Sequence, residues 1–441
     1  MPTPDNKTIF FPTEPEKPIS TRTLIPMIEN KSIYFPSIST ATGEYLKDYK
    51  LNGKSHRFYN KNEDPLFYYP YYLMSAGHNF KRKDVAKGIN WDLSQGILLG
   101  DSGGFQLATE VLKYTDSTCA DIFNWLEDNT NYAMNLDVPI FKKKMAVKGK
   151  DELSWEEQFN ESFTLSKQHF DYFYKNKSGK TKYLNVLHGL TTKDTYKWYE
   201  MASQYDFKGG WGIGSLTTIG DTDIYKIVLA VTFLLQQGEL HKKHYERPLL
   251  HCLGFSKIKY LPYLFYMQKK LNDMGLDFRL SYDSSTPSIE ASFVHVTTTV
   301  TKRGRNVLSL DKAALDGINP RAKFPFPSPV TEGMTFGDIL EFRNDDKGTF
   351  SAKFYTLLTL HNLYKYIDYV QNLEEIIDSN SRKLYTNYFD NDLLTSIDMM
   401  DKAFESKKPY DLMCTDEYRY GIFHTPKQKE LIELHSSKDL F

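Results

Sequence analysis

The sequence predicts an α/β fold, namely a (β/α)8 barrel of the TIM type with a C-terminal helical appendage. Three observations lead to this prediction. From about residue 30 to about residue 310, short apolar runs alternate with longer segments of helical spacing, as in parallel strands joined by crossover helices. The 441 residues are enough for one large barrel and an appendage, and 40% of them are hydrophobic, which supplies a sizeable core. Several runs also end in a polar residue followed by Gly, Pro or Ser, and such strand ends meet at one mouth of a barrel.

Seven apolar runs are the expected strands, and their number favours a barrel over an open doubly wound sheet. They are SIYFPSI (32–38), GILLGD (96–101), YAMNLDVPI (132–140), KYLNVLHG (182–189), GGWGIGSL (209–216), RPLLHCLG (247–254) and DFRLSYDSS (277–285). Between the later runs, apolar residues recur at helical spacing over 154–176, 192–205, 221–240 and 258–275. A further strong helix is expected over 350–378.

The ends of the chain differ in composition from its middle, which predicts three parts. Residues 1–30 are polar and rich in proline, so we expect a flexible N-terminal arm that is unlike a signal peptide. The stretch FPFPSP (324–329) is a plausible break. We therefore expect the barrel domain at 31–330 and the helical appendage at 331–441.

Cysteine usage and hydropathy predict a cytoplasmic protein that does not enter a membrane. The apolar run IVLAVTFLL (227–235) is the longest of the chain and is too short to cross a bilayer. The cysteines are scattered and form no C-x-x-C pair, which excludes a disulfide framework and a cysteine-rich zinc site. They are Cys119, Cys252 and Cys414.

Two aspartates at strand ends are the candidate catalytic pair. In LLGDSGGFQLAT (98–109), Asp101 ends an apolar run and is followed by glycines that permit close approach of a flat ligand or of another backbone. Asp283 occupies the end of the run at 277–285. Of two carboxylates at one mouth, one can attack an anomeric carbon covalently while the other transfers a proton to the leaving group. The alternative is that either aspartate caps the following helix.

Three further polar residues end expected strands near the same mouth. Asp137 matches the adjacent N–H donors on the edge of a purine, although it is equally typical of a turn before Val-Pro. His188 and His251 are candidate substrate contacts, although a lone histidine is more often structural. GGWGIGSL has glycines that let a flat ring approach, and no Lys-Ser/Thr follows, so it is not a phosphate loop.

Two short basic runs are the best local patches for a polyanion, because the net charge of −1 gives no global attraction. They are KRK (81–83) and TKRGR (301–305). The second run contains the candidate phosphate contacts Lys302, Arg303 and Arg305. The alternative is that both runs are solvated surface.

Taken together, these motifs resemble the tRNA-guanine transglycosylase superfamily over about residues 30 to 380. DSGGFQ (101–106) is similar to the segment of the family's general acid/base, SYDSSTP (281–287) to that of its nucleophile, and NLDVP (135–139) to that of the aspartate that reads guanine. GWGIGSL and LHCLGFSK resemble its glycine-rich base-binding strands, and LLTLHNLYKYIDYVQNLEEII (357–377) its C-terminal helix. The resemblance implies catalytic roles for Asp101 and Asp283. The implied substrate contacts are Ser102, Gly103, Phe105 (as a stacking ring), Gln106, Asp137, His188, Gly214, Ser215, Leu216 and His251.

The departures from the family pattern concern zinc and tRNA. The tRNA enzymes have a C-x-C-x-x-C cluster and a histidine that bind zinc; His361 matches that histidine, but PSPVTEGMTFGDI (327–339) has no cysteine. A tetrahedral site needs four ligands, so we predict no metal. The family's Q-G-G motif is His188-Gly189-Leu190 here, and the arginines that follow the family's nucleophile are missing after Asp283. These differences favour the phage and bacterial branch that acts on DNA.

The resemblance implies base exchange by double displacement on a flipped-out guanosine, without a redox or nucleotide cofactor. The implied partners are DNA (or tRNA), a free 7-deazaguanine base such as 7-cyano-7-deazaguanine, and a second copy in a homodimer. Three alternatives remain: a divergent tRNA enzyme, a glycoside hydrolase, and a non-catalytic nucleic-acid-binding subunit. A sugar site usually has a tryptophan platform, and Trp211 alone lies near an expected site strand. A binding subunit has no need of both Asp101 and Asp283.

Overall fold

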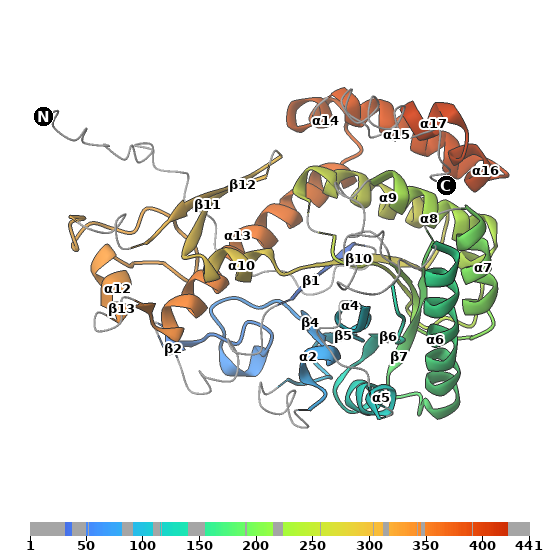
Figure 1. The fold of residues 1–441 in the computed structure, drawn as a ribbon. Coiled ribbons are helices and arrows are strands. Elements are labelled where there is room, and N and C mark those ends of the chain that lie inside the picture. Colours follow the sequence, from blue (N-terminus) through green and yellow to red (C-terminus); the bar gives the residue numbers. More distant parts are fainter. Residues whose placement is uncertain are drawn as a thin grey trace, which may run out of the picture.

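Eight parallel strands form the centre of the molecule (Figure 1). The computed structural model describes residues 31–37, 50–51, 53–81, 91–108, 115, 117–139, 155–189, 192–214, 224–255, 257–302, 304–311, 317–341, 343–344, 349–389 and 391–421. The strands lie in the order β1-β10-β9-β8-β7-β6-β5-β4. Their bounds are β1 Ile33–Pro36, β4 Tyr71–Ser75, β5 Ile97–Asp101, β6 Tyr132–Met134, β7 Lys182–Leu187, β8 Gly210–Ile213, β9 Leu249–Cys252 and β10 Arg279–Ser284.

The two edge strands of this sheet approach each other, so the sheet is a nearly closed barrel. A parallel bridge between Ser37 and Leu73 joins the end of β1 to β4. Each of the seven predicted runs contains one of the strands, whereas β4 was not among the predicted runs. The predicted TIM-type barrel with a helical appendage is confirmed.

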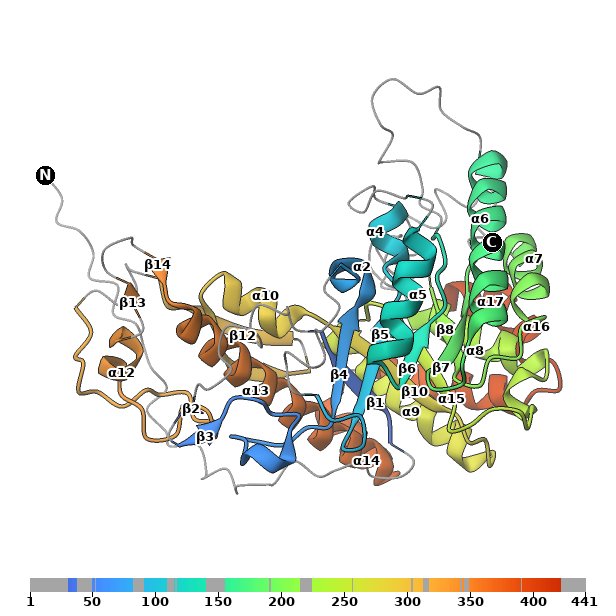
Figure 2. The same ribbon diagram turned by 90° about the horizontal axis from the view of Figure 1, so that it is seen from below.

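Helices surround the barrel, and the four longer predicted ones between the strands are all present. The helices between strands are α5 Thr118–Asn129, α6 Trp155–Asn176, α7 Thr192–Ala202, α8 Ile224–Gln236 and α9 Leu261–Asp273. Shorter helices begin directly beyond strand ends, namely α2 Ala76–Asn79, α4 Gly104–Ala108 and α10 Thr286–Ser292. Figure 2 shows α2 and α4 beyond the ends of β4 and β5.

The C-terminal helices cover two different parts of the barrel. Helix α13 (Ala352–Asp378) is capped by Ser351, whose side chain accepts the Phe354 N–H, and the helix packs against the first strand. The rings of Tyr34 and Tyr366 are 4.7 Å apart, and the Ser32 N–H donates to Glu374 Oε1 at 2.6 Å. The following helices, α14 Arg382–Tyr388, α15 Asn391–Glu405, α16 Pro409–Met413 and α17 Asp416–Gly421, lie on the outer side of α8 and α9 (Figure 1).

This covering explains the composition of α8, which contains the longest apolar run of the sequence. The Tyr225 hydroxyl donates to the Met413 carbonyl at 2.6 Å, so α8 is buried between the barrel and α16. A helix that is covered on two sides is expected to be apolar nearly all round. Nowhere in the part of the chain that the structure describes is a helix both long and apolar enough to cross a bilayer.

A β-hairpin that the sequence analysis did not predict follows α10. It consists of β11 (His295–Thr301) and β12 (Gly304–Ser309). The remaining elements are the short ladders β2 Lys50–Leu51 with β3 Lys54–Ser55 and β13 Arg343–Asn344 with β14 Thr349–Phe350, the helix α12 Phe336–Glu341, and the 3-10 turns η1 Lys61–Glu63, η2 Glu239–His241 and η3 Ile258–Tyr260. The predicted arm at 1–30 lies outside the described residues.

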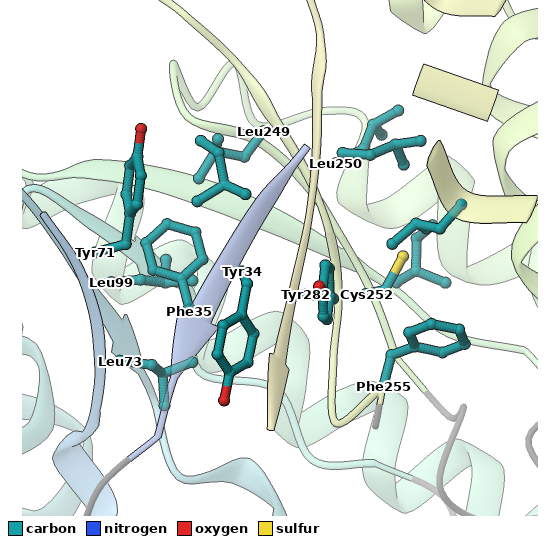
Figure 3. Packing of buried hydrophobic residues seen from close by; sticks show 14 of the residues in the cluster. Tyr34, Phe35, Tyr71, Leu73, Leu99, Leu249, Leu250, Cys252, Phe255 and Tyr282 are labelled. Carbon is teal, nitrogen blue, oxygen red and sulfur yellow. The ribbon is translucent and has the colours of Figure 1, made fainter. Parts of the chain in front are cut away.

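Side chains of β1 alternate between the barrel interior and the helix layer. Phe35 points toward Tyr71 and Leu99, whereas Tyr34 points toward Tyr282 on the other side of the strand (Figure 3). The ring centroids of Phe35 and Tyr71 are 5.7 Å apart. Because successive residues of a strand face opposite sides, this assignment also places Ser281 and Asp283 of β10 on the face opposite to Tyr282.

Candidate active site

Four of the predicted site residues lie at the carboxyl ends of the barrel strands. Asp101 is the last residue of β5 and Asp283 the penultimate residue of β10, while Asp137 and His188 follow β6 and β7. The eight barrel strands are parallel, so these ends belong to one mouth. The negative charges of Asp283 and Asp137 also contribute to raising the pKa of Asp101.

The surroundings of Asp101 raise the pKa of its carboxyl group. Burial raises the pKa of its carboxyl group, and the negative charges of Asp283 and Asp137 raise this pKa further. Ser75 and the Gly103 N–H, which donates to Oδ1 at 3.1 Å, act in the opposite direction. The net shift is upward, so Asp101 is suited to hold and deliver a proton.

The glycines after Asp101 admit neighbouring backbone. Gly103 has a φ of +85°, and a Cβ built on it would lie 2.6 Å from the Cα of Gly77. A Cβ on Gly104 would lie 2.2 Å from the carbonyl oxygen of Asp137. Of the two alternatives that the sequence left open for these glycines, the structure therefore shows close approach of other backbone segments.

Asp283 is contacted by the neighbouring strand β9 and by the turn that follows it. The Gly254 N–H donates to Asp283 Oδ1 at 2.6 Å, and His251 Nε2 lies 3.3 Å from the same oxygen. His251 is fully buried, and its Nδ1 is 3.0 Å from Ser281 Oγ. Gly254 and Ser281 were not among the predicted site residues. The signal for Ser281 is its position two residues before Asp283, which puts it on the same face of the strand.

Asp137 and His188 form a buried pair. Asp137 Oδ2 is 2.5 Å from His188 Nε2, and the side chains are 9% and 1% exposed. The edge of the His188 ring packs on Trp198, with ring centroids 4.8 Å apart. A Cβ on Gly214 would come within 2.2 Å of His188 Cε1, so a glycine at this position makes room for the imidazole. Contact of Gly214 with a base stays a prediction.

The other predicted substrate contacts lie around the start of α4 or beyond the described residues. Ser102 is buried, and Gln106 Nε2 is 3.1 Å from His78 Nε2 on α2. Three further predicted contacts lie wholly or partly outside the described residues. The side chain of Phe105 is not described, and Ser215 and Leu216 are not described at all.

The basic run on the hairpin is divided between an ion pair and the surface. Arg305 Nε donates to Glu290 Oε1 of α10 at 2.7 Å, and its guanidinium lies 5.9 Å from the centre of the Tyr366 ring. Lys302 is partly exposed at the end of the hairpin, and Arg303 lies outside the described residues. In KRK (81–83), only the first residue is described. The guanidinium of Arg305 is thus engaged within the protein.

His361, which the resemblance aligns with a metal-binding histidine, is hydrogen-bonded at both ring nitrogens. Its Nδ1 is 2.9 Å from Ser328 Oγ and its Nε2 is 2.9 Å from the Thr297 carbonyl oxygen. Ser328 Oγ is in turn 3.0 Å from Thr331 Oγ1. Burial lowers the pKa of His361 to about 4, so the ring is neutral. In the described ranges, no three His, Cys, Asp or Glu side chains come together as a metal site.

The mouth thus combines carboxyl groups in different environments. Asp101 has a raised pKa, and Asp283 accepts a backbone N–H beside the buried His251. Asp137 is bonded to His188. Such a set can divide proton transfer, covalent attack and substrate orientation among its members. Comparison with protein-family models and with curated proteins found no match for the chain.

Proposed function

We propose that this protein belongs to the tRNA-guanine transglycosylase superfamily and exchanges guanine in DNA for a 7-deazaguanine. The observation that carries the proposal is the pair Asp101 and Asp283 at one mouth. Burial raises the pKa of Asp101, whereas Asp283 Oδ1 accepts the Gly254 N–H. Carboxyl groups in unlike environments suit a reaction that needs a proton donor and a nucleophile.

In the proposed reaction, Asp283 attacks C1′ of a flipped-out deoxyguanosine. The C1′–O bond to Asp283 forms as the C1′–N bond breaks, and Asp101 gives its proton to the departing guanine. The incoming base, such as 7-cyano-7-deazaguanine, then gives its N–H proton to Asp101. Its nitrogen bonds to C1′ while the ester to Asp283 breaks. Two inversions return the original configuration, and the electrons balance without a redox cofactor.

The Asp137–His188 pair supports the proposed reading of the base. His188 Nε2 is bonded to Asp137 Oδ2, which fixes the plane of the carboxylate. The opposite oxygen, Oδ1, is the proposed acceptor for the N–H groups on the edge of guanine. Lys302, directly after β11, and its neighbour in the sequence, Arg303, are the proposed phosphate contacts, because Arg305 is paired with Glu290.

The environment of Trp211 argues against a glycoside hydrolase. Its side chain is fully buried, and its indole N–H donates to the Tyr245 hydroxyl at 2.8 Å. The ring stacks on Tyr199 at a centroid distance of 5.9 Å. A ring engaged in this way is no platform for a sugar.

The test is incorporation of labelled guanine or 7-cyano-7-deazaguanine into plasmid DNA and, in parallel, into bulk tRNA. We expect label in DNA, its complete loss with Asp283→Asn, and a loss of about 10²–10⁴-fold with Asp101→Asn. The matched control is Asp273→Asn, since Asp273 is half exposed on α9 and paired with Lys269. Label in tRNA alone would favour the tRNA alternative. Label in neither, with DNA still bound, would favour the non-catalytic subunit.

A further inference from the structure

A fully buried histidine nitrogen faces the proposed nucleophile. His251 has no exposed surface, and its Nε2 has no hydrogen-bond partner within the described part of the molecule. This nitrogen lies 3.3 Å from Asp283 Oδ1, although the angles fall outside hydrogen-bond geometry. Buried polar atoms are nearly always paired, so an unpaired one beside a reactive group requires an explanation.

The surroundings of His251 hold its ring, and the Ser281 hydroxyl is the group that can select its tautomer. Ser281 lies opposite His251 in the ladder between β10 and β9, and its Oγ is 3.0 Å from Nδ1. The edge of the ring packs on Phe35, with centroids 5.9 Å apart. A serine hydroxyl that donates to Nδ1 leaves the proton of a neutral imidazole on Nε2. In that tautomer the N–H group lies beside the carboxylate of Asp283, whose Oδ1 is 3.3 Å from Nε2.

We propose that His251 is a positioning residue that, as the neutral Nε2–H tautomer, donates to Asp283 Oδ1 together with the Gly254 N–H and thereby leaves Oδ2 as the attacking oxygen. Both contacts of this carboxylate within the described ranges fall on Oδ1. The role in attack rests on the proposed glycosyl transfer.

The two donors act in both displacements. In the first, the bond from Oδ2 to C1′ forms while Oδ1 becomes the carbonyl oxygen of the ester and keeps its hydrogen bonds. In the second, the C1′–Oδ2 bond breaks and the returning negative charge is shared with Oδ1, where the two N–H groups stabilise it. The carboxylate therefore leaves and attacks in one fixed orientation.

Two substitutions separate the donor from the bulk of the ring. In His251→Gln, the side-chain amide keeps an N–H donor near the position of Nε2, whereas His251→Leu removes it. We measure single-turnover formation of the covalent protein–DNA adduct and the KM of the free base. We expect His251→Gln to stay within about 5-fold of the natural protein and His251→Leu to lose about 100-fold in adduct formation, with KM nearly unchanged. Equal losses in both variants would overturn the proposal.

A second measurement does not depend on activity. Ring 15N shifts of histidine-labelled protein report the tautomer, and the signal that disappears in His251→Gln identifies His251. We expect a neutral Nε2–H ring, and a mixture of tautomers in Ser281→Ala. A ring protonated at Nδ1 alone would overturn the proposal. An Nε2–H ring in a protein that exchanges no base would support the bond to Asp283 but overturn the proposed function together with the role of Oδ2.

Discussion

The most direct test of the site geometry is Gly214→Ala, which places a methyl group against His188. A Cβ at this position would lie 2.2 Å from His188 Cε1 and 2.6 Å from Nδ1, so the ring would have to withdraw by about 1.2 Å to reach an ordinary 3.4 Å contact. The ring is held by Asp137 at 2.5 Å and by Trp198 on its edge. Any shift therefore strains or breaks the buried bond to Asp137. We expect a loss of about 2–4 kcal/mol in the free energy of unfolding.

The matched control is Gly212→Ala, two residues earlier in the same strand. A Cβ on Gly212 meets its nearest atom, Met134 Cγ, at 3.6 Å, which is an ordinary contact. We expect its free energy of unfolding to stay within about 1 kcal/mol of the natural protein. Urea unfolding followed by tryptophan fluorescence measures both variants. Equal stability of the two variants would refute the reasoning, because it would show that His188 is not confined by Asp137 and Trp198.

Three further predictions concern buried and charged groups. Burial lowers the pKa of His361 from 6.5 to about 4. The free energy of unfolding should therefore fall by roughly 3 kcal/mol as the pH drops from 6.5 through 4. In His361→Gln, the urea midpoint should depend less on pH over this range. Burial raises the pKa of Glu374 from 4.5 to about 7, so the sign is opposite: stability is lost as the pH rises from 4.5 through 7, and Glu374→Gln should abolish that loss. An unchanged profile in either variant would contradict the assignment. In DNA-binding titrations, Lys302→Ala should reduce by about one the slope of the logarithm of the binding constant against the logarithm of the salt concentration. Arg305→Ala should mainly lower stability, because its pair with Glu290 is lost. Equal slopes in the two variants would contradict this difference.

The fold class was predictable because a parallel barrel requires a regular alternation of elements, and the strands from β5 to β10 are short apolar runs with turn residues at their ends. Strand β4 escaped prediction because its sequence, YYLMS, follows a proline and begins with tyrosines. A tyrosine ring still packs in a barrel, as Tyr71 does against Phe35. The hairpin strand β11, HVTTTVT, was also missed: threonine favours strands, but these threonines give no apolar alternation.

The candidate site was predictable in its positions and not in its pairings. Parallel strands bring their ends to one mouth, and this rule alone placed Asp101, Asp137 and Asp283 near one another. Which side chains then bond depends on register and reach. His188 is hydrogen-bonded to Asp137, which lies 51 positions earlier in the chain, and no sequence motif predicts that bond. Arg305 likewise reaches Glu290, because the hairpin folds back onto α10.

Strand β1 has a consequence for how this protein is made. Its ladder partner β10 arrives late: the Tyr34 hydroxyl donates to the Ser284 carbonyl, 250 positions further on, and Ser32 bonds to Glu374 later still. At a ribosomal rate of roughly 5–20 residues per second, β10 is synthesised roughly 12–50 seconds after β1. During this interval an aromatic strand with unpaired backbone groups is open to other chains. Newly made protein should therefore depend on chaperones until the segment containing α13 has emerged.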